Sequence, residues 1–221
     1  MANKNRGVIG CGGKKYRELA DVCIYLGNCL RDSNKPDKAK EEYREAIRIN
    51  PNDAEAHNNL GKLLTDSRLY VEAKEEFRKA IEIDLNYAEA HNNLGFLLYI
   101  LRRDVEAEKE YRKVIKINPD FPEAHCKLGR FLRILDRYVE AEEEFRKAIE
   151  IDPNYVEAHN DLGNLLTDLK KRHVEAEEEF RKAIEIDPNY VEAHNNLGYL
   201  LYIQGRFKEA EEENNGLNLK I

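Results

Sequence analysis

At 221 residues the chain is long enough for one or two ordinary globular domains, but 36% of its residues are charged and it contains no tryptophan. This composition is typical of long solvated helices rather than of sheets. A formal net charge of −7 and the absence of any apolar run near the roughly 20 residues that span a bilayer argue against a nucleic-acid partner and against a membrane partner.

The first fifteen residues, 1–15, are predicted to form a flexible leader. Segment 8–11 resembles a bacterial lipoprotein cleavage box. A secretory signal needs about 7 to 15 apolar residues before its cleavage site, and only Val8 and Ile9 qualify here.

The four cysteines show no paired metal-ligand spacing; they are Cys11, Cys23, Cys29 and Cys126. Cys23 and Cys29 lie six residues apart on one predicted helix, which directs them to different sides and disfavours a disulfide. Reduced thiols and a cytoplasmic setting are therefore expected. Neither a metal site nor a cofactor is predicted.

One short motif recurs along most of the chain. A Leu-Gly pair occurs six times, with four intervals of 34 residues and one of 35. The pairs are Leu26-Gly27, Leu60-Gly61, Leu94-Gly95, Leu128-Gly129, Leu162-Gly163 and Leu197-Gly198. A fixed period of this size is typical of stacked copies of one small unit, none of which buries its apolar face alone. The pattern predicts one continuous solenoid without a domain boundary, and a function that resides on a surface.

Residues 54–87 show what one unit contains. Apolar residues at helical spacing predict two amphipathic helices; the two sets are Ala56, Leu60, Leu63 and Leu64, then Ala73, Phe77, Ala80 and Ile81. Segment 66–69 is the predicted turn between them, and 84–87 closes the unit. Most units have proline at the closing position, so Leu85 predicts a less sharply defined helix end. Gly61 lies inside the first helix, where glycine costs about 0.5 to 1 kcal/mol relative to alanine, and is predicted to admit a close-packed neighbour.

This combination resembles the tetratricopeptide repeat, whose signature of about 34 residues runs Leu-Gly, Ala, Phe or Tyr, Ala and Pro. The matching residues in the other units are Ala39, Tyr43, Ala46 and Pro51; Ala107, Tyr111 and Pro119; Ala141, Phe145, Ala148 and Pro153; Ala176, Phe180, Ala183 and Pro188. Val114 replaces one alanine. The resemblance implies an all-α, right-handed superhelical solenoid of antiparallel helix pairs over residues 16–213. Its repeats lie at about 20–53, 54–87, 88–121, 122–155 and 156–190, with a partial repeat at 191–213 and a tail at 214–221.

Histidine replaces the family's early tryptophan in five units, and Cys23 replaces it in the first. The histidines are His57, His91, His125, His159 and His194. A row of histidines suggests metal binding, but packed helices lie about 8–10 Å apart, whereas zinc ligands converge within about 2.1 Å of one ion. The histidines are therefore predicted to be packing residues.

In tetratricopeptide proteins a stripe of the first helices lines a concave groove, and the resemblance assigns eleven residues of this chain to it. These are Asn28, Asn59, Lys62, Asn93, Phe96, Lys127, Arg130, Asp161, Asn164, Asn196 and Tyr199. An asparagine amide donates and accepts at once, so Asn59, Asn93 and Asn196 suit an extended peptide backbone. They are similar to the asparagine ladder of long tetratricopeptide superhelices, such as the one preceding the O-linked N-acetylglucosamine transferase catalytic domain. Lys127 and Asp161 interrupt the row. The alternative is that the asparagines solvate a helix face or bond to the neighbouring helix.

Two features of the stripe predict selectivity. Lys127, Arg130 and Arg133 recur at i, i+3 and i+6 and predict the docking of an acidic segment. The candidate apolar anchors are Phe96, Tyr99 and Ile100 in the third unit, and Tyr199, Tyr202 and Ile203 in the sixth. The basic insertion at 170–173 is interpreted as a loop irregularity rather than as a site.

These features predict a non-catalytic scaffold that binds an extended protein or peptide segment in its groove. No nucleophile, base and orienting group can be placed together, so no catalytic residue is predicted. A structural role is the alternative. The sixth unit has Asn214 where the aromatic residue belongs, and the tail 217–221 either covers the end of the stack or joins another molecule. In the latter case the module dimerises or stacks end to end through its C-terminal repeat.

Overall fold

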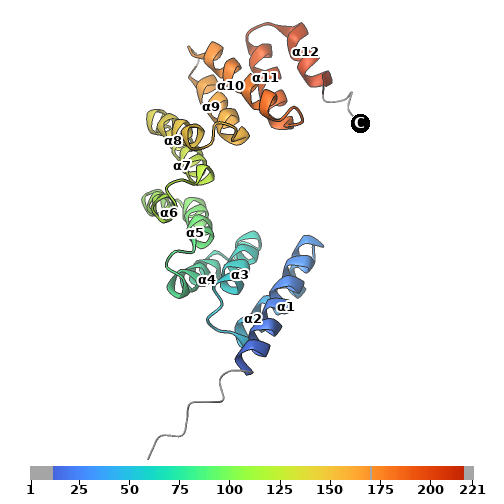
Figure 1. The fold of residues 1–221 in the computed structure, drawn as a ribbon, viewed down its shortest axis with the longest axis vertical. Coiled ribbons are helices and arrows are strands. Elements are labelled where there is room, and N and C mark those ends of the chain that lie inside the picture. The colour runs from blue at the N-terminus through green and yellow to red at the C-terminus, as the bar shows by residue number, and fades with distance from the viewer. Residues whose placement is uncertain (1–11, 170, 217–221) are drawn as a thin grey trace, which may run out of the picture. The chain divides into compact units, whose positions relative to one another are not determined.

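The computed structural model describes residues 12–169 and 171–216, and within them the chain is all α-helical. Twelve described helices follow one another as antiparallel pairs, one pair for each repeat (Figure 1). Their bounds are α1 Gly12–Asp32, α2 Pro36–Ile49, α3 Ala54–Asp66, α4 Tyr70–Ile83, α5 Ala88–Ile100, α6 Asp104–Ile117, α7 Pro122–Ile134, α8 Tyr138–Ile151, α9 Val156–Asp168, α10 His173–Ile186, α11 Val191–Ile203 and α12 Phe207–Gly216. The predicted all-α solenoid of helix pairs is confirmed.

The ends of the helical region differ slightly from the predicted limits. Helix α1 begins at Gly12, so the last part of the expected leader 1–15 is helical. Helix α12 ends at Gly216, inside the predicted tail. Segments 1–11 and 217–221 lie outside the described residues.

The chain divides into two compact units, each larger than a single repeat: the first unit is Met1–Ile117 and the second unit is Asn118–Ile221. The first contains α1 to α6, and the second contains α7 to α12. The repeat motif runs through this boundary without a break, which is why the sequence predicts one continuous solenoid. Each repeat of a solenoid contacts only its neighbours, so a solenoid is continuous only where every junction between repeats is well packed. The repeat motif alone does not show how well a junction is packed.

A ring-on-glycine contact fixes each described helix pair from the first repeat to the fifth. A Cβ atom built on Gly61 of α3 would lie 2.6 Å from Cε1 of Phe77 on α4, so only glycine allows the ring to approach this closely. The same close contact joins Gly27 to Tyr43, Gly129 to Phe145 and Gly163 to Phe180, whereas the ring of Tyr111 lies farther from a Cβ atom built on Gly95, at 3.3 Å. The predicted close neighbour of each glycine is therefore confirmed as the aromatic residue of the second helix.

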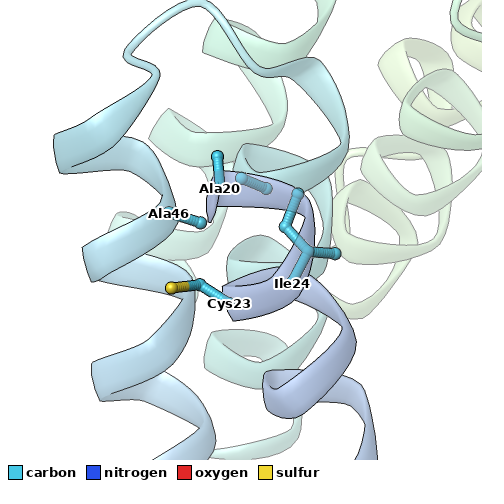
Figure 2. Close-up of a cluster of buried hydrophobic side chains, with 5 residues drawn as sticks. Ala20, Cys23, Ile24 and Ala46 are labelled. Carbon is cyan, nitrogen blue, oxygen red and sulfur yellow. The ribbon is translucent and has the colours of Figure 1, made fainter. Parts of the chain in front are cut away.

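The first repeat shows how small side chains allow close helix packing. Ala20, Cys23 and Ile24 of α1 and Ala46 of α2 belong to one buried cluster, in which Cys23 points toward α2 and Ile24 points away from it (Figure 2). Ala56 of α3 belongs to the same buried cluster and links the first repeat to the second. Large residues at these alanine positions would overpack the contact between the helices.

The second helices end at the same place whether or not proline follows. Helix α4 ends at Ile83, although Leu85 stands at the closing position. The Asp84 carboxylate accepts a hydrogen bond from the backbone N–H of Asn86 at 2.9 Å, which forms an Asx turn. Asp152 and Asp187 make the same bond to Asn154 and Asn189 where proline is present. The expected loosening at Leu85 is not observed, because the aspartate already turns the chain.

Candidate functional site

The predicted groove asparagines tie neighbouring first helices together. Within the first unit, Asn93 Nδ2 of α5 donates to Asn58 Oδ1 of α3 at 2.9 Å. Within the second unit, Asn196 Nδ2 of α11 donates to Asn160 Oδ1 of α9 at 2.8 Å. The interpretation that these side chains bond to the neighbouring helix is confirmed for both. The amides therefore have a structural role at the junctions between repeats.

At the junction between the first and second repeats, the equivalent side chains make a weaker contact. Asn28 accepts a 2.7 Å hydrogen bond from the Tyr43 hydroxyl and a longer one, 3.4 Å, from Asn59 Nδ2. Asn59 is only 6% exposed. Asn93 and Asn196 are half-buried. Asn93 also donates to the Glu89 carboxylate and keeps acceptor capacity, whereas Asn196 keeps one N–H and acceptor capacity beyond its bond to Asn160. These two, rather than Asn59, have amide groups that a ligand can reach.

The three basic residues of the fourth repeat are all paired with carboxylates. Lys127 lies 2.5 Å from Glu123, and Arg133 Nη1 lies 2.7 Å from Asp168. Arg130 Nε donates to Asp161 at 2.5 Å. The stripe therefore does not form the uncompensated positive patch that its residue types predict.

The Arg130–Asp161 pair is the most buried of the three. Asp161 is nearly inaccessible, and burial raises its pKa to about 6, while Arg130 and Arg133 oppose this rise. The raised pKa of Arg130 results from the same carboxylate, although burial acts in the opposite direction. Because a buried partner left alone is costly, this pair is poorly suited to exchange with a ligand.

The remaining stripe residues are placed as follows. Lys62 Nζ forms an ion pair with Glu89 of the next first helix at 3.0 Å. Burial would raise the pKa of Glu89, but the hydrogen bond and charge of Lys62, together with hydrogen bonds from Asn58 and Asn93, outweigh burial and lower this pKa. Asn164 is half-buried, while Phe96 and Tyr199 are exposed and available as apolar anchors.

A hollow of about 670 Å³ lies in the second unit, beside the loop ends of its first helices. Its apolar wall includes Ile134, Tyr199 and Ile203, and Arg133 with Asp168 forms a polar wall. Tyr138, Asp136, Thr167 and His173 complete the lining. The residues come from three successive repeats, so the hollow exists only when these repeats are stacked.

Sequence reasoning missed part of this hollow. The insertion at 170–173 is predicted to be a loop irregularity, yet His173 lines the hollow and its Nε2 is buried without a hydrogen-bond partner. Tyr138 and His173 open their second helices at equivalent places in successive repeats. An aromatic ring at the first position of two successive second helices is the sequence signal that could have identified this wall of the hollow.

The row of histidines has a clear structural role. His125 Nδ1 lies 2.7 Å from Glu144 of the second helix, and Nε2 lies 3.1 Å from the carbonyl oxygen of Pro119, in the loop before the repeat. The same two contacts recur for His57 with Glu76 and Pro51, His91 with Glu110 and Leu85, His159 with Glu179 and Pro153, and His194 with Glu213 and Pro188. Each imidazole thus joins both helices of its repeat to the preceding loop, as expected for packing residues.

These contacts also affect the glutamates. Burial would raise the pKa of Glu144, but hydrogen bonds from His125 and Lys147 outweigh burial and lower it. The same balance lowers the pKa of Glu76, Glu110 and Glu179. Across residues 12–169 and 171–216, no group of three or more His, Cys, Asp or Glu side chains is arranged to hold a metal ion.

The described cysteines are free thiols. Cys126 is buried in α7, and burial raises its pKa well above the usual range, so its thiolate is disfavoured. Burial likewise raises the pKa of Cys23, whereas Cys29 is exposed. None of the described helices combines the length and the apolar composition needed to cross a bilayer.

Solved structures with the same fold include PilF of Pseudomonas aeruginosa, which is 23% identical over 90% of each chain with a TM-score of 0.74. MamA is 27% identical, with a TM-score of 0.61 over 74% of this chain and 95% of that one. YrrB, described as a TPR protein with an unusual peptide-binding site, is 24% identical, with a TM-score of 0.57 over 85% and 96%. Comparison with curated proteins gives no match.

Family profiles match the chain without a gap from residue 27 to residue 212. Matches described as TPR repeat cover 27–66 and 130–169. Those described as Tetratricopeptide repeat cover 54–87, 88–121, 110–143, 156–190 and 179–212. The helix pairs, the ring-on-glycine contacts and these matches agree with one another: the chain belongs to the tetratricopeptide repeat family.

Proposed function

We propose that the chain is a non-catalytic scaffold whose second unit binds an extended segment of a partner protein along α7, α9 and α11. Tetratricopeptide repeats typically mediate protein–protein interactions, and YrrB, a protein of the same fold, is described as having a peptide-binding site. The observation that carries the proposal is the 670 Å³ hollow, which has both apolar and charged walls. A pocket of this kind fits one anchoring side chain of a segment that continues past it.

The walls define the anchor. Ile134, Tyr199 and Ile203 offer exposed apolar surface, which favours an aliphatic or aromatic side chain. Arg133 and Asp168 form a partly exposed pair, with side chains 34% and 42% exposed, and surface pairs contribute about 0–1 kcal/mol. A ligand carboxylate therefore exchanges with Asp168 at little cost. We assign the selection of an acidic residue to Arg133, since Arg130 is committed to the buried Asp161.

The half-buried amides are the proposed contacts to the ligand backbone. Asn196 uses one N–H in its bond to Asn160, and the remaining N–H and acceptor capacity suit a peptide group. Asn164 lies on the same stripe one repeat earlier. In the first unit, Lys62, Asn93 and Phe96 form a comparable stripe, and the row remains similar to the asparagine ladder of the transferase superhelices.

The test uses three baits in parallel: the wild-type chain, an Arg133→Ala/Ile134→Ser variant and a Val139→Ser control. Val139 is an exposed apolar residue on α8 that does not line the hollow. A partner captured from the source lysate is then reduced to its binding segment, and its affinity for the three chains is measured by calorimetry. We expect the hollow variant to bind at least about tenfold more weakly, because truncating an anchor that acts as a hot spot costs about 2 kcal/mol or more and tenfold corresponds to about 1.4 kcal/mol.

The control distinguishes the site from a general effect on the fold. Val139→Ser should bind as the wild type does. Equal affinity of the wild-type chain and the hollow variant for the segment would overturn the proposal.

A further inference from the structure

The first helix exposes an apolar face that the inner repeats bury. Leu19, Val22, Tyr25 and Leu26 lie at helical spacing on α1, and we call them the N-face. Val22 is 59% exposed and Leu26 is 43% exposed. Their counterparts within the two units, Ala56, Ala90, Ala158 and Ala193, and Leu60, Leu94, Leu162 and Leu197, are at most 5% exposed. Inner first helices are covered by the preceding repeat, and α1 has no such repeat before it in the described chain.

The last repeat exposes the complementary surface. Asn195, Tyr199 and Tyr202 of α11, with Phe207 and Glu211 of α12, border a cavity of about 520 Å³, and we call them the C-face. The three aromatic side chains are each 61% exposed. The rings of Tyr202 and Phe207 meet edge to face, with centroids 5.3 Å apart. A terminal repeat normally needs a polar outer surface, and this one is aromatic.

The C-face occupies the positions by which inner repeats hold the repeat that follows. Asn58 and Asn160, the counterparts of Asn195, accept the amides of the next first helix. Glu142 and Glu177, the counterparts of Glu211, accept charged hydrogen bonds from Arg172 and Arg206 of the next repeat. Lys62, a counterpart of Tyr199, reaches Glu89 on the next first helix. The C-face therefore keeps the layout of an inner junction.

We propose that the C-face receives the N-face of a second copy of this chain, so that copies join head to tail. The apolar N-face would cover the cavity between α11 and α12. By repeat position, Lys35 of the second copy takes the place of Arg172 and Arg206, opposite Glu211. Asp21 of the second copy takes the place of Glu89, opposite the Tyr199 hydroxyl. Both residues are exposed and oppose a group that they can pair with.

The geometry of such a contact is heterologous. Each copy uses two different surfaces, so association does not stop at a dimer unless the chain of copies closes into a ring. This distinguishes the proposal from a two-fold dimer formed through the C-face alone. It also distinguishes it from a C-face covered by the chain's own tail or by another protein, neither of which would make the isolated chain associate.

The test measures mass against concentration by sedimentation equilibrium for the wild-type chain, an N-face variant (Val22→Glu/Tyr25→Glu) and a C-face variant (Tyr202→Glu/Phe207→Glu). We expect the wild-type mass to rise beyond that of a dimer and each variant alone to remain a monomer. An equimolar mixture of the two variants keeps one intact N-face and one intact C-face, so its mass should double and stop there. Val71→Glu, an exposed change on α4, is the control and should associate as the wild type does.

Several outcomes would overturn the proposal: a wild-type chain that stays monomeric at every concentration, an N-face variant that still dimerises, or a mixture that does not. A milder pair of changes guards against misfolding of the variants. Glu211→Lys should weaken association, and adding Lys35→Glu to the same chain should restore it, because the opposed charges are then exchanged. Failure of this restoration would contradict the register that we propose.

Discussion

The glycine in each first helix matters for the ring it admits rather than for its own flexibility. Near Gly61, the ring of Phe77 occupies the space a methyl group would need, at 2.6 Å. Near Gly95, the nearest atoms of Tyr111 lie at 3.3 Å. Both glycines belong to the first unit and face an aromatic ring, but the Phe77 ring lies closer to Gly61 than the Tyr111 ring lies to Gly95.

We expect Gly61→Ala to destabilise the protein and Gly95→Ala to be close to neutral. Overpacking costs about 1–3 kcal/mol, while replacing a helical glycine by alanine returns about 1 kcal/mol. The net loss for Gly61→Ala is therefore up to about 2 kcal/mol, whereas the ring of Tyr111 needs to move only a few tenths of an ångström. Urea unfolding of both variants checks the order. Equal losses would show that the ring distance does not determine the cost.

Asp161 stands where the equivalent positions of three other repeats have asparagine, and its burial gives it a distinct pH dependence. Its pKa is raised from an ordinary 3.8 to about 6. A group whose pKa is higher in the folded state stabilises it fully at pH below the unfolded value and loses this contribution as the pH rises through the folded value. The groups that face it are Arg130, Arg133, Glu157 and Cys126.

The wild type should therefore lose stability as the pH rises from about 4 to about 7, because Asp161 becomes charged. The Asp161→Asn variant should not show this loss. The difference in unfolding free energy between the two proteins should change by at most about 3 kcal/mol over this range. Glu144 and its equivalents have lowered pKa values, so they destabilise both proteins alike at pH below about 4.5. A difference that stays constant with pH would show that Asp161 does not titrate as its burial predicts.

At the scale of the helix, the end of α4 is set by an aspartate rather than by proline. Asp84 forms the same Asx turn as Asp152 and Asp187, although Leu85 replaces the usual proline. Leu85 therefore occupies the same position of the turn that proline occupies in the equivalent repeats. Its side chain is 72% exposed, so little packing depends on it.

Leu85→Pro should stabilise the protein by about 0.4–1 kcal/mol, because proline restricts the unfolded chain at a position already compatible with it. Thermal and urea unfolding test this directly. His91 bonds to the carbonyl oxygen of Leu85, as His125 does to that of Pro119, so this contact should survive the change. A destabilised variant would mean that the turn at residue 85 differs from those of its siblings.

The sequence predicted the helix pairs because apolar spacing and the Leu-Gly period are local signals. It did not predict the contacts of the histidines, because the partner of His125 lies 19 residues away among several glutamates with similar local surroundings. The ion pair of Arg130 was missed for a related reason: Asp161 lies 31 residues on, in the next repeat. Long-range pairing between repeats is set by stacking, which a single repeat does not encode.

The same limit applies to the hollow. Its lining combines residues from three repeats, and the inserted residue near His173 breaks the regular period that guided the interpretation. Tyr199 was identified because an exposed aromatic residue on a first helix is visible in the sequence. Ile134 and Tyr138 needed the structure.

At the scale of the whole molecule, the division into two units bears on how the chain unfolds. Residues 1–117 and 118–221 each form a compact unit with its own aromatic contacts. In a repeat protein, stability is close to a sum of repeat terms and nearest-neighbour terms, so a local loss spreads only as far as these couplings carry it. A buried ring removed from one unit therefore tests whether the unfolding of the chain follows the two-unit division.

Phe180→Ala removes a fully buried ring from α10, and such a change costs about 3–5 kcal/mol. We expect hydrogen exchange to accelerate throughout α9 to α12, which depend on this packing, while α1 to α4 exchange as in the wild type. Val174→Ala, an exposed change on the same helix, should leave the exchange pattern unaltered. If Phe180→Ala instead raises exchange uniformly from α1 to α12, the chain unfolds as one cooperative body, because only a strong coupling across the division would transmit a loss from α10 to the first helices.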